Sequence, residues 1–285
     1  MYTIFMITIL VTNLLAIDIY SPKAPPAIPL INSSILQNVI FYDNLNTAIV
    51  PKLLKKEIGL YIIPTNVAAK LYNKGLDIIV LGTLSEGFIY FCSTDGSDYN
   101  NLDEKEIYVG GKGSSPDVIN NMLIKNVKNI RYSGSSEIAK LMIAGKISNC
   151  ILPQPLASMV YFSADAKLQD LRKRYKEKFL TENIPQVCMV IDRNYYSENR
   201  NEIDRIILDY KREIDQIYSG QINAEIILDK LKWNMTEDQL KIAIKTMNLS
   251  FSLDIESITI YLKNLLSTTP ETIGGKLPDE KIFIP

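Results

Sequence analysis

The sequence contains no histidine. Ser-His-Asp triads, Cys-His pairs and His-ligated metal sites all need an imidazole, so the composition excludes them. Carboxylate, lysine, tyrosine and cysteine side chains can still do chemistry, so an enzyme is disfavoured rather than excluded. We predict a protein that is not an enzyme, with no catalytic residues, no metal site and no cofactor.

Cysteine is scarce, and each of the three cysteines, Cys92, Cys150 and Cys188, lies in an apolar run. An odd number of cysteines without close, patterned spacing describes neither a disulfide framework nor a zinc site. We therefore expect three buried thiols that act as small hydrophobic side chains.

An excess of charge of one sign is also lacking, since 31 basic and 32 acidic residues leave a formal net charge of −1. A nucleic-acid-binding surface usually shows a basic excess, so we expect no nucleic-acid partner. The mixed charges of residues 166–179 are interpreted as a solvated helix face. With 285 residues, 47% of them hydrophobic, the chain has an ordinary globular composition and room for one or two domains.

Residues 1–16 carry no charged side chain. The run is too short to span a membrane comfortably, which takes about 20 apolar residues. It fits the apolar core of a secretory signal that ends near Ala16, and we expect a periplasmic or otherwise extracytoplasmic protein. A buried N-terminal strand or helix is the alternative, because no Lys or Arg precedes the run and Leu14 is not small.

Apolar strand-like runs alternate with helical patterns over residues 16–165, which predicts an α/β chain with mainly parallel strands. The chain beyond residue 194 is mostly helical by its periodicity. One pattern occurs twice, over residues 53–68 and 142–157: a helix end, a polar turn, a buried strand, a proline and a new helix start. The repetition suggests two lobes, each offering one wall of a cleft.

Ligands of such sheets bind at the carboxyl ends of strands. The loops expected there are short and rich in Pro, Gly, Ser, Thr and Asn; they comprise residues 21–26, 64–66, 83–87, 112–116 and 153–155. Only Lys23, Glu86 and Lys112 in these loops suit acid–base chemistry, which favours a binding cleft over an active site.

A glycine-rich stretch, residues 110–117, follows one of the predicted strands. Ser115 can cap a helix that has Pro116 at its first position. Glycines let a backbone approach a ligand, and a helix start favours negative charge. The stretch is neither a Walker A motif nor GxGxxG, so an unliganded strand–turn–helix corner is an equal alternative.

Taken in order, six segments resemble the solute-binding proteins of ABC importers, specifically the sulfonate/nitrate/thiamine-pyrimidine type. They are Ser21–Ala27, Ile63–Gly75, Gly110–Asp117, Ala144–Ile147, Leu152–Ala157 and Gly274–Asp279. The resemblance implies a type II periplasmic-binding fold, with two α/β lobes joined by two crossing strands around a ligand cleft. It also implies capture of a small polar or anionic molecule by hinge closure, an ABC permease as membrane partner, and a monomer.

Carried onto this chain, the resemblance places the first lobe at residues 17–91 and 190–285 and the second at 94–187. The hinge strands then lie near residues 88–95 and 184–191. The residues predicted to bind ligand are Ser21, Lys23, Thr65, Asn66, Ser85, Glu86, Gly113, Ser114, Ser115, Gln154 and Gln186.

The chain departs from the pattern of that family at Gln154, where an acidic residue, usually glutamate, is typical. Gly59 and Ser148–Asn149 likewise stand in place of acidic residues. Two alternatives stay open. One is an enzyme on the same fold, of the thiamine-pyrimidine or menaquinone-pathway type, although those enzymes rely on histidine. The other is a sensory or surface interaction protein.

Overall fold

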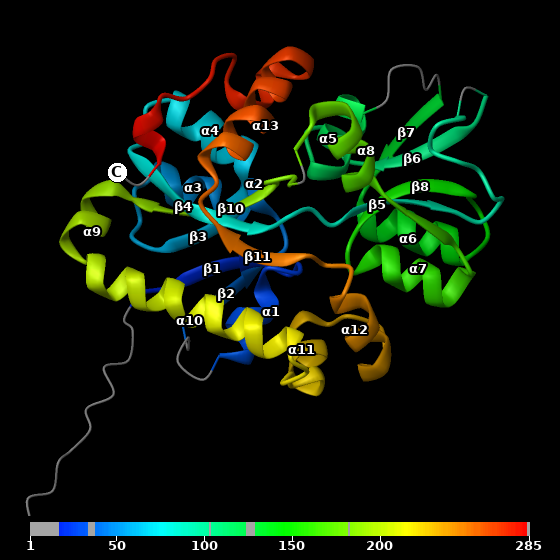
Figure 1. Ribbon diagram of the computed structural model, residues 1–285, viewed down its shortest axis with the longest axis horizontal. Helices are drawn as coiled ribbons and strands as arrows, with labels where there is room; N and C mark the ends of the chain where they lie inside the picture. The colour runs from blue at the N-terminus through cyan, green and yellow to red at the C-terminus, as the bar shows by residue number, and fades with distance from the viewer. Residues whose placement is uncertain (1–16, 34–37, 103, 124–128, 182, 284–285) are drawn as a thin grey trace, which may run out of the picture.

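The computed structural model describes residues 17–33, 38–102, 104–123, 129–181 and 183–283 (Figure 1). The predicted signal segment, residues 1–16, lies outside them. None of the helices in the described ranges is both long and apolar enough to cross a membrane. The chain forms two β-sheets, each covered by helices on both faces, and thus two α/β lobes.

A six-stranded sheet in the order β11-β4-β10-β3-β1-β2 organises the first lobe. Its strands are β1 (Ile19–Pro22), β2 (Val39–Tyr42), β3 (Leu60–Pro64), β4 (Ile78–Ser85), β10 (Val187–Asp192) and β11 (Leu249–Ser252). Strand β1 pairs in parallel with β2 and β3, whereas β10 runs antiparallel between β3 and β4. The expectation of mainly parallel strands concerned residues 16–165, and β1, β2 and β3 meet it; it fails at β5 (Ile89–Ser93) of the second sheet, which runs antiparallel to β8 (Asn149–Pro153). Strands β10 and β11, which come from later in the chain, also run antiparallel to their neighbours.

Helices cover both faces of this sheet, with α4 and α13 above it and α1 and α10 below it in Figure 1. The helices of this lobe are α1 (Ala27–Asn32), α2 (Leu45–Ala48), α3 (Val50–Leu54), α4 (Thr65–Asn73), α9 (Arg193–Glu198), α10 (Arg200–Tyr218), α11 (Ala224–Leu231), α12 (Glu237–Ile244) and α13 (Ile255–Thr268). Two 3-10 turns, η1 (Pro270–Ile273) and η2 (Glu280–Ile282), follow. The apolar periodicity predicted for α10 is confirmed, since Ile203, Ile206, Tyr210 and Ile217 are all buried.

A five-stranded sheet in the order β7-β6-β8-β5-β9 organises the second lobe. It comprises β5 (Ile89–Ser93), β6 (Glu106–Gly110), β7 (Asn129–Ser133), β8 (Asn149–Pro153) and β9 (Lys167–Asp170). One face is covered by α5 (Ser115–Leu123) and α8 (Leu171–Phe179), the other by α6 (Ser135–Ile143) and α7 (Leu156–Ala164) (Figure 1). The stretch interpreted as one charged helix thus contains an edge strand followed by α8.

The three cysteines are buried free thiols, as predicted. Cys92 and Cys150 lie opposite each other in the β5–β8 register. Cys188 lies in β10, where burial raises the pKa of its thiol to about 12.

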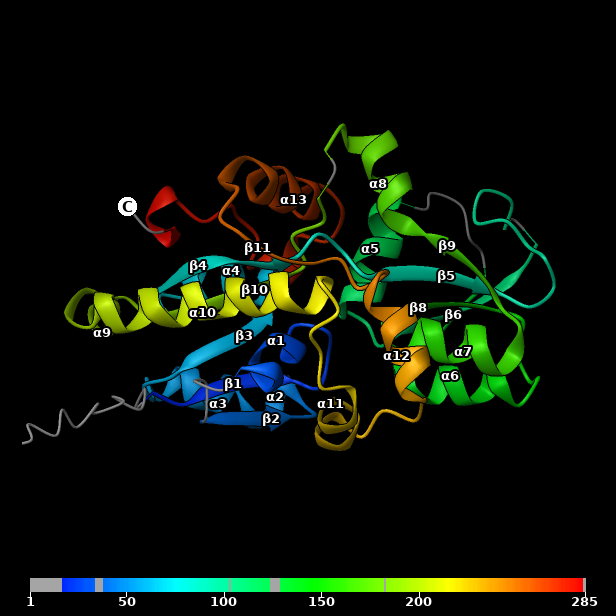
Figure 2. The ribbon, with the colours of Figure 1, turned by 60° about the horizontal axis from the view of Figure 1, so that its bottom comes forward.

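The chain passes between the lobes from β4 to β5 and from α8 to β10 (Figure 2). The expected crossing strands contain β5 and β10, which are interior strands of their own sheets. The two passages are bonded to each other: Ile184 N donates to Glu86 O (3.0 Å), and Phe88 N donates to Gln186 Oε1 (3.4 Å). Gly87 between them has a φ of 111°.

Residues 83–87 were expected to form a polar loop, but β4 continues through Ser85. The reason is β11, which the sequence did not reveal: Thr83 pairs with Ser252, and Ser85 with Leu249. A partner strand from far along the chain satisfies backbone groups that a loop would leave to water.

The larger of two apolar clusters runs through both lobes, because α13 packs against α5. Asn264 Nδ2 of α13 also donates to the Tyr175 hydroxyl of α8 (3.3 Å). The smaller cluster lies between the second sheet and the helices α6 and α7. The lobes are therefore packed together on the α5–α13 side.

Asp95 anchors the loop that follows β5. Burial alone would raise the pKa of its carboxyl, but hydrogen bonds from Ser97, Lys105 and Asn149 outweigh burial and hold that pKa far below its usual range. A carboxyl group whose pKa is lower in the folded than in the unfolded state stabilises the fold at pH values above the unfolded-state pKa, which is near 3.9.

We expect Asp95→Asn to lower the free energy of unfolding at pH 7 by about 1 kcal/mol, because the carboxylate bonds are charge-assisted but partly screened by solvent. The gap between wild type and variant should close as the pH falls below about 4 and through the folded-state pKa. Urea unfolding at a series of pH values measures this gap, and a gap of constant size would contradict the assignment.

Candidate functional site

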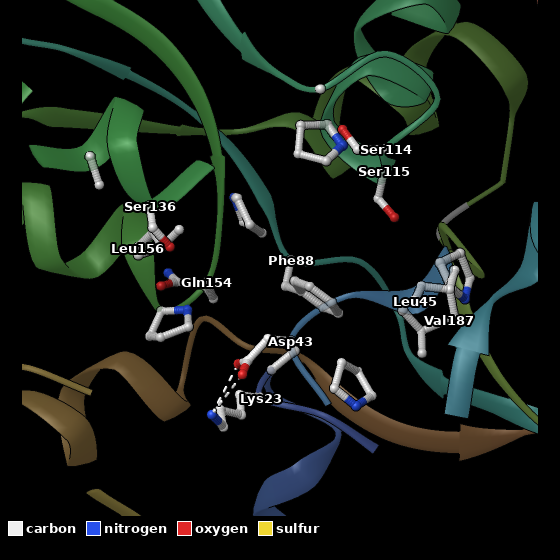
Figure 3. Close-up of a pocket in the computed structure, with 18 of the residues that line it drawn as sticks. Lys23, Asp43, Leu45, Phe88, Ser114, Ser115, Ser136, Gln154, Leu156 and Val187 are labelled. Carbon is white, nitrogen blue, oxygen red and sulfur yellow. Dashed lines mark hydrogen bonds and ion pairs between the residues drawn. The ribbon is translucent and has the colours of Figure 1, made fainter. Parts of the chain in front are cut away.

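A cleft of about 890 Å³ lies between the two lobes (Figure 3). Its first wall comes from the corners after β1, β2 and β3 and from the connection between α11 and α12. Its second wall comes from the glycine-rich loop after β6, from α6, and from the corner between β8 and α7. Phe88, just before β5, and Val187, at the start of β10, lie at its base, where the chain passes between the lobes.

The first wall carries two lysines and one carboxylate. Lys23 Nζ lies 3.0 Å from Asp43 Oδ1, a pair drawn in Figure 3. Lys232 is paired with Asp229, which does not line the cleft, at 2.8 Å. Trp233 follows Lys232 and is half-buried in the cleft wall.

The glycine-rich loop builds the second wall. A Cβ on Gly110 would lie 2.8 Å from Ser114 Oγ and 3.1 Å from Ser135 Oγ, so glycine allows this loop and the start of α6 to meet. Ser114 Oγ is buried, and it has no hydrogen-bond partner among the described residues. Ser114 itself lines the cleft, but its hydroxyl oxygen is packed behind the surface.

Asp117, in the first turn of α5, fixes the glycine-rich loop through its carboxylate. Its carboxylate accepts from Gly113 N (2.7 Å) and from Asn121 Nδ2 (3.1 Å), and the residue is 5% exposed. Gly113 has a φ of 79°, a conformation that favours glycine. This acidic side chain is committed to the loop and does not line the cleft.

Lys112 and Lys140 add two positive charges to the second wall. Lys112 Nζ lies 5.3 Å from the centre of the Tyr132 ring. Within the described part of the chain, no ion pair or hydrogen bond involves the exposed side chain of Lys140. Among its described lining residues, the cleft thus gathers four lysines and one carboxylate, that of Asp43, although the whole chain is nearly neutral.

Helix starts reinforce this positive potential. The first turns of α4, α5, α6 and α7 each contribute lining residues: Val67, Ser115, Ser136 and Leu156. The first N–H groups of a helix have no partner within the helix and carry a partial positive charge. Several such turns facing one cleft favour a ligand with negative charge.

Gln154 lies at the base of the cleft, and both ends of its amide are bonded within the protein. Its Nε2 donates to Thr246 Oγ1 (2.7 Å), and its Oε1 accepts from Ser158 N (3.1 Å). Its side chain therefore links the second lobe to the turn that follows α12.

The structure brings together five of the predicted ligand-binding residues on the cleft lining: Lys23, Gly113, Ser114, Ser115 and Gln154. Others are buried beside the cleft and do not line it: Ser21, Thr65, Asn66, Ser85 and Gln186.

Several of these buried residues have bonds within the protein. Ser85 Oγ accepts from Gly87 N, and Gln186 Oε1 from Phe88 N, so both side chains brace the crossings. The exposed Glu86 pairs with Arg172 at 3.5 Å and lies outside the lining.

The sequence reasoning missed Asp43, Ser136, Lys140, Lys232 and Trp233, all of which line the cleft. Ser136 and Lys140 lie on one helix, in its first and second turns, after a strand whose C-terminal end was not treated as a ligand corner. Lys232 and Trp233 come from a helix–helix connection, where a lone tryptophan beside a lysine was the available signal. Among the described residues, no three His, Cys, Asp or Glu side chains gather as metal ligands.

No protein-family model matches the sequence, and no curated protein matches it either. Solved structures do match over nearly the whole chain. A crystal structure of an ABC transporter from Parabacteroides distasonis has 19% sequence identity and a TM-score of 0.76, covering 94% of this chain and 98% of that one. The periplasmic aliphatic sulphonate binding protein SsuA from Escherichia coli has 10% identity and a TM-score of 0.71, covering 93% of this chain and 90% of that one.

The alkanesulfonate-binding protein SsuA from Xanthomonas axonopodis pv. citri, bound to MOPS, has 9% identity and a TM-score of 0.67, covering 94% of this chain and 97% of that one. At these identities the similarity establishes architecture. The chain has the periplasmic-binding-protein fold seen in solute-binding proteins of ABC transporters, which confirms the fold predicted from the sequence.

Proposed function

We propose that this protein is the extracytoplasmic solute-binding component of an ABC importer and captures a small anion between its two lobes. One observation carries the choice of an anion: four lysines and one carboxylate line the cleft. In a site with low-dielectric walls, charges of one sign raise the local concentration of the opposite ion.

The contacts on the second wall suit such a ligand. Ser115 and Ser136 line this wall, and the first turns of α5 and α6 supply backbone N–H groups beside Lys112 and Lys140. Apolar side chains, including Phe88, complete the lining and could hold an uncharged portion of the ligand. Because two of the similar proteins are described as binding sulfonates, this anion class is the first to test.

The proposal includes hinge closure between lobes made of residues 17–91 with 190–285 and residues 94–187, an ABC permease as partner, secretion, and a monomer without enzymatic activity. The lining favours binding over catalysis, because the charged side chains among its described residues are four lysines and one carboxylate, which is itself paired with Lys23. A sensor built on the same cleft would bind the same ligand class.

The test is a ligand screen on the purified protein. Sulfonates such as MOPS, nitrate, carboxylates, pyrimidines and amino acids are added singly, and the melting temperature is recorded. A ligand that binds only the native state must raise the melting temperature. At a free ligand concentration of 100 times the dissociation constant, it adds about 3 kcal/mol to the free energy of unfolding. Because Trp233 is the only tryptophan in the chain and lines the cleft, its fluorescence reports binding directly.

We expect stabilisation and a fluorescence change with one or more anions. Stabilisation by cations or neutral solutes alone would contradict the choice of an anion. No response to any solute in the panel would count against the receptor role, and chemical turnover of a bound compound would point to the enzyme alternative.

A further inference from the structure

The turn between α12 and β11, residues 246–248, connects elements of both lobes. Thr246 Oγ1 accepts from Gln154 Nε2 (2.7 Å), and Thr246 O accepts from the Tyr90 hydroxyl (2.7 Å). Tyr90 lies in β5 and Gln154 follows β8, so both donors belong to the second lobe. Strand β11, which follows this turn, is hydrogen-bonded to β4 of the first lobe.

Asn248 ties the same turn to the passage from β4 to β5. Its Nδ2 donates to Gly87 O (2.7 Å), and its carbonyl accepts from Glu86 N (3.0 Å). The residue has a φ of 49°, a left-handed conformation that asparagine tolerates better than most side chains. The turn is therefore a third link at the base of the cleft, beside the two passages of the chain.

The Thr246 hydroxyl also determines which way the Gln154 amide points. It donates to Ala243 O (2.7 Å), which leaves its lone pairs to accept from Gln154 Nε2. The amide oxygen of Gln154 then faces the N–H of Ser158, in the first turn of α7 (3.1 Å). That turn begins at Leu156, which lines the cleft.

We propose that Thr246 is a positioning residue for the binding cleft. Its hydroxyl orients the Gln154 amide and so holds the first turn of α7, and with it Leu156, against the first lobe. The importance of this position for ligand capture rests on the proposed function, whereas the link between the lobes does not.

The test measures amide hydrogen exchange by NMR on the full chain without ligand. Thr246→Val keeps the shape of the side chain and removes the hydroxyl. We expect exchange of the Ser158 N–H to become about fivefold faster, the effect of losing one hydrogen bond. Thr246→Ser, which retains the hydroxyl, should exchange at nearly the wild-type rate.

Thr268→Val is the matched control, because Thr268 Oγ1 makes a similar bond to Asn264 O (2.8 Å) at the end of α13, away from this turn. This variant should leave the exchange rate of the Ser158 N–H unchanged. Tyr90→Phe, which removes the bond to Thr246 O, gives a second variant and should also speed exchange of the Ser158 N–H. A wild-type exchange rate of the Ser158 N–H in Thr246→Val would overturn the proposal. So would an equal increase of that rate in Thr246→Val and in Thr268→Val. Neither outcome depends on finding a ligand.

Discussion

Replacing Lys140 with glutamate should weaken binding of an anionic ligand by about 30-fold. Losing one solvent-exposed attraction and adding one repulsion each cost roughly 1 kcal/mol. Lys140 is the choice because its exposed side chain takes part in no ion pair or hydrogen bond within the described ranges, so the fold should be unaffected. Isothermal titration with an anion identified by the screen measures the change.

Lys146→Glu is the matched control. Lys146 lies in the same lobe, in the turn before β8, and it is exposed but does not line the cleft. Lys146→Glu changes the net charge by the same amount as Lys140→Glu, but at a position that does not line the cleft, so its effect on ligand affinity should be small. The difference in affinity between the two variants should shrink in high salt. Equal losses of affinity in both variants would show that the ligand responds to overall charge and would place its site elsewhere.

Gly87→Ala should lower the free energy of unfolding by about 2–4 kcal/mol. Gly87 has a φ of 111°, and a Cβ there would lie 3.0 Å from Arg172 Cγ and 3.1 Å from Ile184 Cβ. Backbone strain and close packing therefore add at the point where the two passages between the lobes touch. Urea denaturation monitored by circular dichroism gives the free energy.

Gly96→Ala separates these two causes. Gly96 also has a positive φ, 78°, but a Cβ at this position would have no described atom within 4 Å, so backbone strain is its only cost. We expect a loss of about 1 kcal/mol in this control. If both variants lost the same stability, close packing at the crossing would contribute nothing.

Local pattern was sufficient to locate most strands and the corners that follow them. The repeated pattern contains β3 and β8 and ends in the first turns of α4 and α7, and Gln154 and the loop at residues 113–115 do line the cleft, because apolar runs and glycine-rich turns are encoded locally. Strand β11 was not predicted, because it has only four residues, two of them polar, and is flanked by helical sequence. Its strand conformation depends on β4, more than 160 residues earlier in the chain.

The missed cleft residues share that cause. Lys140 resembles an ordinary helix-surface lysine until α6 is placed against the cleft, and Trp233 enters the cleft only because the chain returns to it after α11. Conversely, Thr65 was predicted to bind ligand from a loop at a strand end, and Gln186 from a predicted hinge strand, yet both are buried behind the lining. Sequence spacing identifies the corner, whereas packing decides which atoms of the corner reach the solvent-filled space.

The strand order of the two sheets has a consequence for how the protein is made. The second sheet is built from one continuous stretch, and its last strand ends at Asp170. The first sheet needs β10, whose residues 187–192 separate β3 from β4, so it has an unfilled gap until that later segment is available. During synthesis from the N-terminus, the second lobe can therefore fold first, while the apolar strands before residue 86 lack β10, the strand that completes their sheet.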